Sequence, residues 1–215
     1  MNTAETKAKP GQERRLILAS ASPRRIQLLK NLGLTFEVEP ADIDESVEDG
    51  VSPQTAVQEL SAHKAAAILE KLRRQNTDPN LDFIIIAADT LVADADEVLG
   101  KPQDRTEAIA MLKQLAAKPH QVFTGVHVID LRNGKEEHHQ ECGATTVYFR
   151  PLTEAEITSY VDTGEPMDKA GAYALQGIGA FLVEKIDGCA ANVIGLPVPR
   201  VVALLRRIGV KVMGL

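Results

Sequence analysis

The sequence contains very little cysteine and few aromatic residues. It has two cysteines, no tryptophan, three tyrosines and five phenylalanines in 215 residues. Cys142 and Cys189 stand far apart, which excludes a disulfide framework and a CxxC metal site. The simplest interpretation is a reduced setting, so we expect a cytoplasmic protein.

A membrane span, a signal segment and a basic excess are also missing. No apolar run reaches the length of a membrane span, and the polar first residues contain no apolar signal segment. We therefore expect no membrane association, a flexible tail over 1–13 and a single domain over 14–215. The 30 acidic and 24 basic residues argue against nucleic-acid binding. An acidic protein can still bind an anion if its basic side chains gather in one cleft.

What is present is an alternation of strand and helix patterns. Apolar runs and alternating patterns predict strands, and cap residues followed by helical spacing predict helices. One hairpin turn, Asn133-Gly134, stands among them. This order predicts an α/β protein with a mixed sheet. The expected strands are 15–19, 35–39, 83–88, 120–130, 141–149 and 181–186, and the expected helices are 23–32, 53–74, 106–116, 153–164 and 197–208.

A turn rich in serine and arginine joins the first predicted strand to the first predicted helix. Ser22 is a suitable helix cap, and Pro23 suits the first helical position. Free backbone N–H groups at a helix start attract anions, and Ser20, Arg24 and Arg25 add donors that match phosphate oxygens. The turn therefore indicates a phosphate site, although a capped helix with two solvated arginines has the same local sequence.

The apolar strand 83–88 is expected to end at Asp89-Thr90. A carboxylate at that edge of an open α/β sheet can bind a divalent cation or accept a proton from water. The alternative is an ordinary aspartate that caps a loop. Histidine and cysteine spacings for a metal are absent, so any metal is expected to be Mg²⁺ or Mn²⁺ on oxygen ligands.

Two further segments carry polar groups that suit a nucleotide. Lys101, between Gly100 and Pro102, can reach a phosphate or be a solvated loop lysine, and no Walker spacing surrounds it. Gln176 lies in a glycine-rich stretch, where its amide can read a base or a sugar.

Five segments, taken in order, resemble the signature of the Maf family. The resemblance covers 15–208, and the segments are 19–25, 88–90, 99–102, 165–173 and 195–197. It implies an α/β fold with a long curved mixed β-sheet flanked by helices, two lobes and a central cleft, as in Maf and inosine triphosphatase-like proteins. It also implies a homodimer.

The resemblance further implies a nucleoside triphosphate pyrophosphatase that releases the monophosphate and pyrophosphate. The segment 168–173 resembles the branch that acts on dTTP and UTP, with modified pyrimidine nucleotides as further candidates. The alternatives are the 7-methyl-GTP branch of the same family, a non-catalytic nucleotide-binding regulator of septum formation, and a plain interaction protein.

Residue roles follow from the same resemblance. Asp89 matches the proposed proton acceptor, and Glu45 with Asp89 is expected to bind the metal during water attack on the α-phosphate. Arg24, Thr90 and Gln176 match positions tied to substrate choice. The full expected set is catalytic Asp89, metal ligands Glu45 and Asp89, and substrate-binding Ser20, Arg24, Arg25, Lys64, Thr90, Lys101 and Gln176.

The chain departs from that branch at Ala174-Leu175, where relatives commonly have Gly-Ile. Alanine adopts a positive φ less readily than glycine. A left-handed conformation at residue 174 would therefore shift the loop that carries Gln176.

Overall fold

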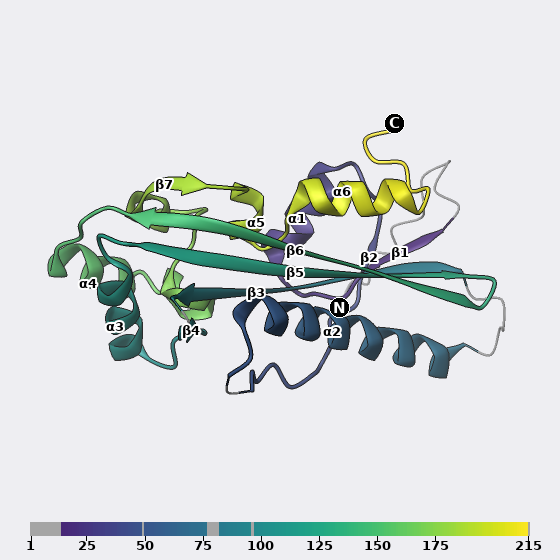
Figure 1. The fold of residues 1–215 in the computed structure, drawn as a ribbon, viewed down its shortest axis with the longest axis horizontal. Helices are drawn as coiled ribbons and strands as arrows, with labels where there is room; N and C mark the ends of the chain where they lie inside the picture. The colour runs from purple at the N-terminus through teal and green to yellow at the C-terminus, as the bar shows by residue number, and fades with distance from the viewer. Residues whose placement is uncertain (1–13, 49, 77–81, 96, 215) are drawn as a thin grey trace.

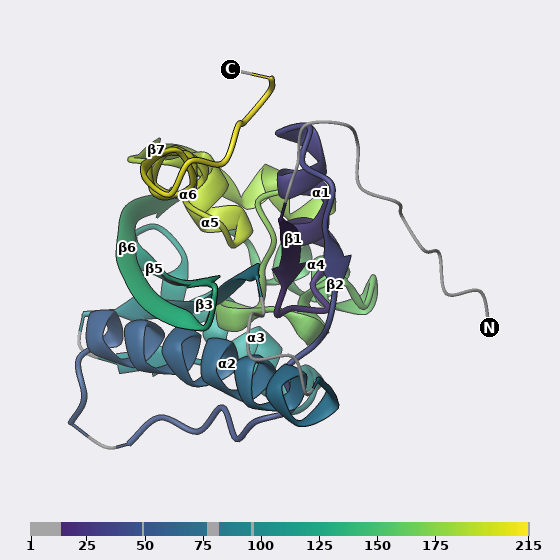
Figure 2. The ribbon, with the colours of Figure 1, turned by 90° about the vertical axis from the view of Figure 1, so that its right-hand side faces the viewer.

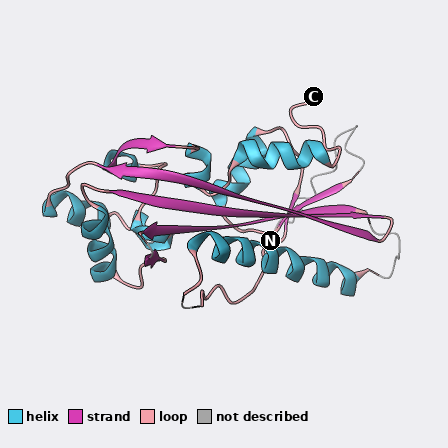
Figure 3. Cartoon of the chain, in the orientation of Figure 1, coloured by secondary structure: helices cyan, strands magenta, loops and turns pink. Residues whose placement is uncertain are grey.

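The computed structural model describes residues 14–48, 50–76, 82–95 and 97–214, so the tail predicted over 1–13 lies outside the described residues. The described strands form one mixed sheet in the order β2-β1-β3-β5-β6-β7, with β4 paired to β3 (Figure 3). The strands are β1 (Arg15–Leu18), β2 (Glu37–Val38), β3 (Phe83–Asp94), β4 (Glu97–Leu99), β5 (Pro119–Arg132), β6 (Lys135–Phe149) and β7 (Val183–Asp187).

Six α-helices and three 3₁₀ turns complete the described chain. They are α1 (Pro23–Asn31), α2 (Pro53–Gln75), α3 (Arg105–Leu115), α4 (Glu154–Asp162), α5 (Ala190–Ile194), α6 (Val198–Arg207), η1 (Glu165–Asp168), η2 (Ala170–Ala172) and η3 (Ile178–Leu182). Within the described ranges, no helix is both long and apolar enough to cross a membrane.

The long strands β3, β5 and β6 extend along the molecule and carry helices on both faces (Figures 1 and 2). Successive strand residues point to opposite faces, so the unbroken apolar run in β3 supplies two cores. Ile85 packs with Ile68 of α2 on one face. Ile86 packs with Leu29 of α1 and Leu205 of α6 on the other.

The two cores just described form the first lobe. A second lobe lies at the other end of the long strands (Figure 1). There, Leu112 of α3 and Tyr160 of α4 pack with Val122 of β5 and Val147 of β6 in a separate buried cluster. The predicted α/β architecture, with a mixed sheet, flanking helices and two lobes, is confirmed.

Local turn signals correctly predicted the starts of α1 and α4 and the hairpin between β5 and β6. The Ser22 side chain accepts the Arg25 N–H, which caps α1. Thr153 and Glu156 form a capping box at the start of α4, where a helix was predicted from residue 153. Asn133 and Gly134 both have positive φ, 47° and 75°, as a tight hairpin turn requires.

The prediction that the third strand ends at Asp89 is wrong. β3 continues to Asp94, because it stays paired with β5 as far as Ala93. Asp89 therefore lies inside the strand. β6 likewise begins at Lys135 instead of residue 141, since its polar first part also pairs with β5.

Four short elements also differ from the prediction. The second strand is limited to Glu37–Val38, and β7 begins at Val183 because residues 178–182 form η3. The strand β4 and the helix α5 were not predicted, since each is too short for a periodic pattern.

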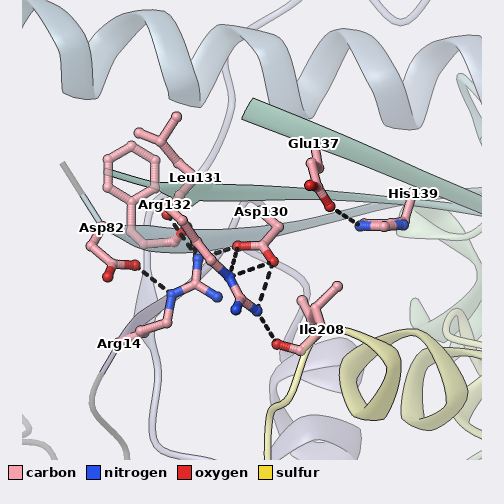
Figure 4. A network of polar contacts seen from close by, with 9 residues as sticks. Arg14, Asp82, Asp130, Leu131, Arg132, Glu137, His139 and Ile208 are labelled. Atoms are coloured by element: carbon pink, nitrogen blue, oxygen red, sulfur yellow. Dashed lines mark hydrogen bonds and ion pairs between the residues drawn. The ribbon is translucent and has the colours of Figure 1, made fainter. Parts of the chain in front are cut away.

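A network of hydrogen bonds and ion pairs between arginines and aspartates connects the start of β1 to the end of β5 and to the end of α6 (Figure 4). Asp130 is 3% exposed and accepts hydrogen bonds from Arg14 and Arg132. Arg14 also pairs with Asp82, and Arg132 donates to the Ile208 carbonyl. Burial opposes ionisation of Asp130, but the two guanidinium groups hold its pKa below the ordinary value. These residues stabilise the fold and do not line the cleft described next.

Candidate active site

A cleft of about 530 Å³ lies along β3, between the stretch of β3 that pairs with β1 and the stretch that pairs with β4. β1 pairs with β3 only as far as Ile86, and β4 pairs with it only from Val92 onward. Residues from loops of both lobes line this interval. All the predicted site residues line this cleft: Ser20, Arg24, Arg25, Glu45, Lys64, Asp89, Thr90, Lys101 and Gln176.

The alternation of β3 separates its two polar residues. Asp89 continues the series that packs on α2, and its Oδ1 lies 2.5 Å from Lys64 Nζ of that helix. Thr90 continues the series that faces α1, and its Oγ1 lies 3.0 Å from Arg25 Nη2. The strand thus presents an acid paired with lysine on one face and a hydroxyl paired with arginine on the other.

Lys64 connects two carboxylates. Its Nζ lies 2.5 Å from Asp89 and 2.7 Å from Glu45, and Lys101 Nζ lies 3.7 Å from the second oxygen of Glu45. Lys64 and Asp89 are 5% and 7% exposed, whereas Glu45 is half-exposed. Burial raises the pKa of Glu45, but Lys64, Lys101 and Arg25 hold it below the ordinary value. Acidic and basic groups therefore alternate in the cleft, in the order Asp89, Lys64, Glu45 and Lys101.

Arg25 is held by neutral acceptors. Its guanidinium donates to the Gly195 carbonyl at 2.8 Å, to Thr90 at 3.0 Å and to Ser20 at 3.2 Å. Burial lowers its pKa, and the charge of Asp89 partly offsets this effect. Among the described residues Arg25 has no carboxylate within ion-pair distance, so its fixed charge is available to an anion.

Arg24 faces the second lobe. Its Nη1 lies 3.6 Å from Oδ2 of Asp168, an exposed residue that also lines the cleft. Asp168 was not among the predicted site residues, although it falls within the recognised segment 165–173. The signal for it was therefore present in the sequence.

Two buried residues behind Thr90 were also missed. Thr124 Oγ1 lies 3.0 Å from Thr90 Oγ1 and donates to the Asn192 carbonyl at 2.9 Å. Asn192 in turn donates to the Val122 carbonyl. These contacts join β3, β5 and α5, and no local pattern in the sequence indicates them.

Gln176 lies in the second lobe, between Tyr173 and Leu182 of its buried cluster. Its side chain is exposed, and within the described part of the chain it makes no hydrogen bond to protein. Beside it, the buried Tyr173 hydroxyl is 2.8 Å from His120 Nε2. Positive φ occurs at Gly171 and Ala172, 66° and 56°, and not at Ala174. The shift expected from alanine at residue 174 therefore does not arise.

The two acids predicted to hold a cation, Asp89 and Glu45, lie together here and share Lys64. The described residues contain no group of three His, Cys, Asp or Glu side chains that could hold a metal ion. Mg²⁺ is commonly bound by one or two carboxylates together with water and substrate phosphates. The pair fits a cation that arrives with phosphate, and it does not fit a cation held by protein groups alone.

The arrangement suits a polyphosphate. The cleft presents the start of α1 and the basic groups of Arg24, Arg25, Lys64 and Lys101, which favour anionic oxygens. Asp89 lies among them as a buried carboxylate, a group that can in general accept a proton.

Comparison with known proteins gives concordant matches. The family model described as Maf-like protein matches residues 15–208. A dTTP/UTP pyrophosphatase of Caldicellulosiruptor bescii is 45% identical over 200 residues, which cover 93% of this chain and 98% of that protein. The proteins of the same name from Desulforamulus reducens and Desulfitobacterium hafniense are 47% identical over 200 residues and 48% identical over 189 residues. These matches cover 93% and 87% of this chain, and 99% and 82% of the respective relatives.

Proposed function

The chain belongs to the Maf family, and on that premise we propose that it is a nucleoside triphosphate pyrophosphatase that hydrolyses dTTP and UTP. The products are the nucleoside monophosphate and pyrophosphate. One observation carries the proposal, namely that a single cleft gathers Arg24, Arg25, Lys64 and Lys101 around the buried carboxylate of Asp89. The names of relatives that are 45–48% identical support the choice of bases.

The basic side chains bind the triphosphate and neutralise the charge that grows during reaction. This is the main task of a protein in phosphoryl chemistry, where positioning and electrostatic stabilisation dominate. Arg25 is preorganised for it, because the Gly195 carbonyl and two hydroxyl groups fix its guanidinium before substrate binds. Arg24 is held less closely, since its contact with Asp168 is long at 3.6 Å.

Asp89 orients a water molecule and accepts its proton. The water oxygen forms a bond to the α-phosphorus, and the bond from that phosphorus to the oxygen bridging to the β-phosphate breaks. Pyrophosphate leaves with the electron pair, and the proton on Asp89 passes to solvent. Lys64 holds Asp89 in place through the 2.5 Å contact.

We also propose a divalent cation, Mg²⁺ or Mn²⁺, at Asp89 and Glu45. Bound together with the triphosphate, it would supply charge neutralisation at the phosphoryl oxygens and acidify a bound water. Its support is the carboxylate pair, which suits the coordination that Mg²⁺ shares with substrate.

The test is turnover of Asp89→Asn. Pyrophosphate release from dTTP and UTP with Mg²⁺ should fall at least ~10²-fold in kcat, as is typical when a group that acts in the transition state is removed. Asp162→Asn is the matched control, because Asp162 is exposed on α4 and, among the residues that the structure describes, forms an ion pair with Arg105 alone. Near wild-type turnover of Asp89→Asn would rule out Asp89 as the base.

A panel of the common triphosphates and 7-methyl-GTP tests the substrate. A preference for dTTP and UTP, with or without activity on modified pyrimidine nucleotides, supports the proposal. A preference for 7-methyl-GTP would overturn it, and nucleotide binding without pyrophosphate release would indicate a non-catalytic regulator.

The homodimer and the cytoplasmic location stay predictions. Light scattering on the purified chain measures the mass in solution, and a mass of one chain would contradict the dimer. Fractionation of the source cells tests the location.

A further inference from the structure

The loop of residues 174–179, here called the Gln176 loop, is held by two residues outside the cleft. Glu165 accepts the N–H of Ile178 at 2.9 Å and the N–H of Gly179 at 2.8 Å. Tyr160 donates its hydroxyl to Glu165 at 2.9 Å and accepts the N–H of Ala174 at 3.2 Å. The pair thus binds both ends of the loop.

The state of both side chains suits these roles. Tyr160 is 1% exposed in the core of the second lobe, and burial together with the Glu165 charge raises its pKa, so the hydroxyl stays protonated. Burial opposes ionisation of Glu165, but the Gly179 and Ile178 amides and the Tyr160 hydroxyl lower its pKa. A carboxylate can accept all three hydrogen bonds at once.

The loop approaches this pair so closely that two positions require glycine. Gly177 has φ 97° and ψ −150°, and a Cβ there would lie 2.5 Å from Glu165 Oε2. A Cβ on Gly179 would lie 2.5 Å from the Tyr160 hydroxyl and from the Ala174 carbonyl. The backbone of the loop is therefore shaped around Tyr160 and Glu165.

We propose that Tyr160 and Glu165 are positioning residues for nucleoside recognition, which act by fixing the Gln176 loop against the cleft. The proposal rests on the proposed function of the cleft. The Gln176 side chain makes no hydrogen bond to the described protein, so the place of its amide depends on the loop backbone. Neither Tyr160 nor Glu165 lines the cleft, so each acts through the loop.

The groups that face phosphate come from other elements. Arg25 lies on α1, Lys64 on α2 and Asp89 on β3, and their contacts do not involve the Gln176 loop. A loosened loop should therefore weaken binding of the nucleoside part and spare binding of the pyrophosphate part. A general loss of structure would weaken both.

The experiment compares Glu165→Gln and Tyr160→Phe with the wild-type chain. Glutamine keeps the size of Glu165 but turns an NH₂ group toward a backbone N–H, and phenylalanine removes the hydroxyl that links the loop ends. Glu154→Gln is the matched control, because the Glu154 side chain is 77% exposed on α4 and, within the described part of the chain, forms an ion pair with Lys113 alone. Calorimetry with dTMP and with inorganic pyrophosphate, measured separately, gives the affinity for each half of the substrate.

We expect each test variant to bind dTMP about tenfold more weakly. This is the effect expected from the loss of one or two hydrogen bonds to a charged or buried partner. Pyrophosphate affinity should change by less than about twofold. Within the described structure, the changed residues share no hydrogen bond or ion pair with the groups that bind pyrophosphate, and separate sites act independently. With dTTP, KM should rise more than kcat falls, and the preference for dTTP over CTP should shrink. Glu154→Gln should match the wild type throughout.

A double-variant cycle tests whether Glu165 acts through Gln176. If it does, Glu165→Gln combined with Gln176→Ala should bind dTMP no more weakly than Gln176→Ala alone, whereas independent groups would add. Additive losses, equal losses for dTMP and pyrophosphate, unchanged dTMP binding, or unfolding of both test variants would each overturn the positioning role. Wild-type binding of dTMP and pyrophosphate without turnover of dTTP would instead refute the proposed activity.

Discussion

The ion pair of Lys64 and Asp89 gives the sharpest test of the site, because its strength can be measured without substrate. Both residues are nearly buried, and their charged atoms lie 2.5 Å apart. In Lys64→Met the Asp89 carboxylate loses its only side-chain donor among the described residues. Removal of one partner of a buried pair costs about 3–5 kcal/mol. We expect about 3 kcal/mol, because the cleft is open to water.

Asp89→Asn should cost less. Lys64 keeps Glu45 as a partner at 2.7 Å, so no isolated buried charge remains, and a loss of about 1–2 kcal/mol is expected. The double variant Lys64→Met/Asp89→Asn carries neither charge. Its loss should therefore be smaller than the sum of the single losses by about 1–3 kcal/mol.

Urea denaturation at pH 7, without divalent cation or nucleotide, measures these free energies of unfolding. The control cycle uses Lys113→Met and Glu154→Gln, an exposed pair at 2.5 Å. Exposed pairs couple by about 0.2–1 kcal/mol despite short distances, so the control should fall in this range. A coupling at Lys64 and Asp89 no larger than the control would refute the inference that a buried ion pair organises the cleft.

Two further predictions address Arg25 and His120. Arg25→Lys keeps the charge but loses the planar fork that meets the Gly195 carbonyl and two hydroxyls, so initial rates with dTTP should fall about 10²-fold in kcat/KM, and unchanged kinetics would contradict the preorganised role. Burial lowers the pKa of His120 from 6.5 to about 4, so the unfolded chain takes up the proton first and the free energy of unfolding should fall as pH drops from 6.5 toward 4. His120→Gln should reduce that slope in urea titrations across this window, and an identical slope would show that His120 titrates normally.

Local chemistry explains why so much of the fold was predictable. The cap at Ser22, the capping box at Thr153 and the hairpin at Asn133-Gly134 depend on residues within four positions of one another. The apolar run in 83–88 likewise indicates a strand buried on both faces, whatever lies beside it.

The far end of β3 shows where such reasoning stops. After Ala88 the polar pair Asp89-Thr90 interrupts the apolar run, and the predicted strand ended there, but hydrogen bonds to β5 carry β3 on to Asp94. Those bonds join residues that lie far apart in the chain. A pattern within one segment does not contain them.

For the cleft, the sequence by itself indicated nine of the side chains that line it, through five recognisable segments and the wider family resemblance, although it did not single out Asp168. Only the tertiary structure decided how they are paired. The alternation of β3 directs Asp89 to Lys64 and Thr90 to Arg25, and the fold of the second lobe brings Tyr160 and Glu165 behind the Gln176 loop. The physical reason is that side-chain chemistry is local, whereas direction, burial and partnership arise only when strands and helices from distant segments pack together.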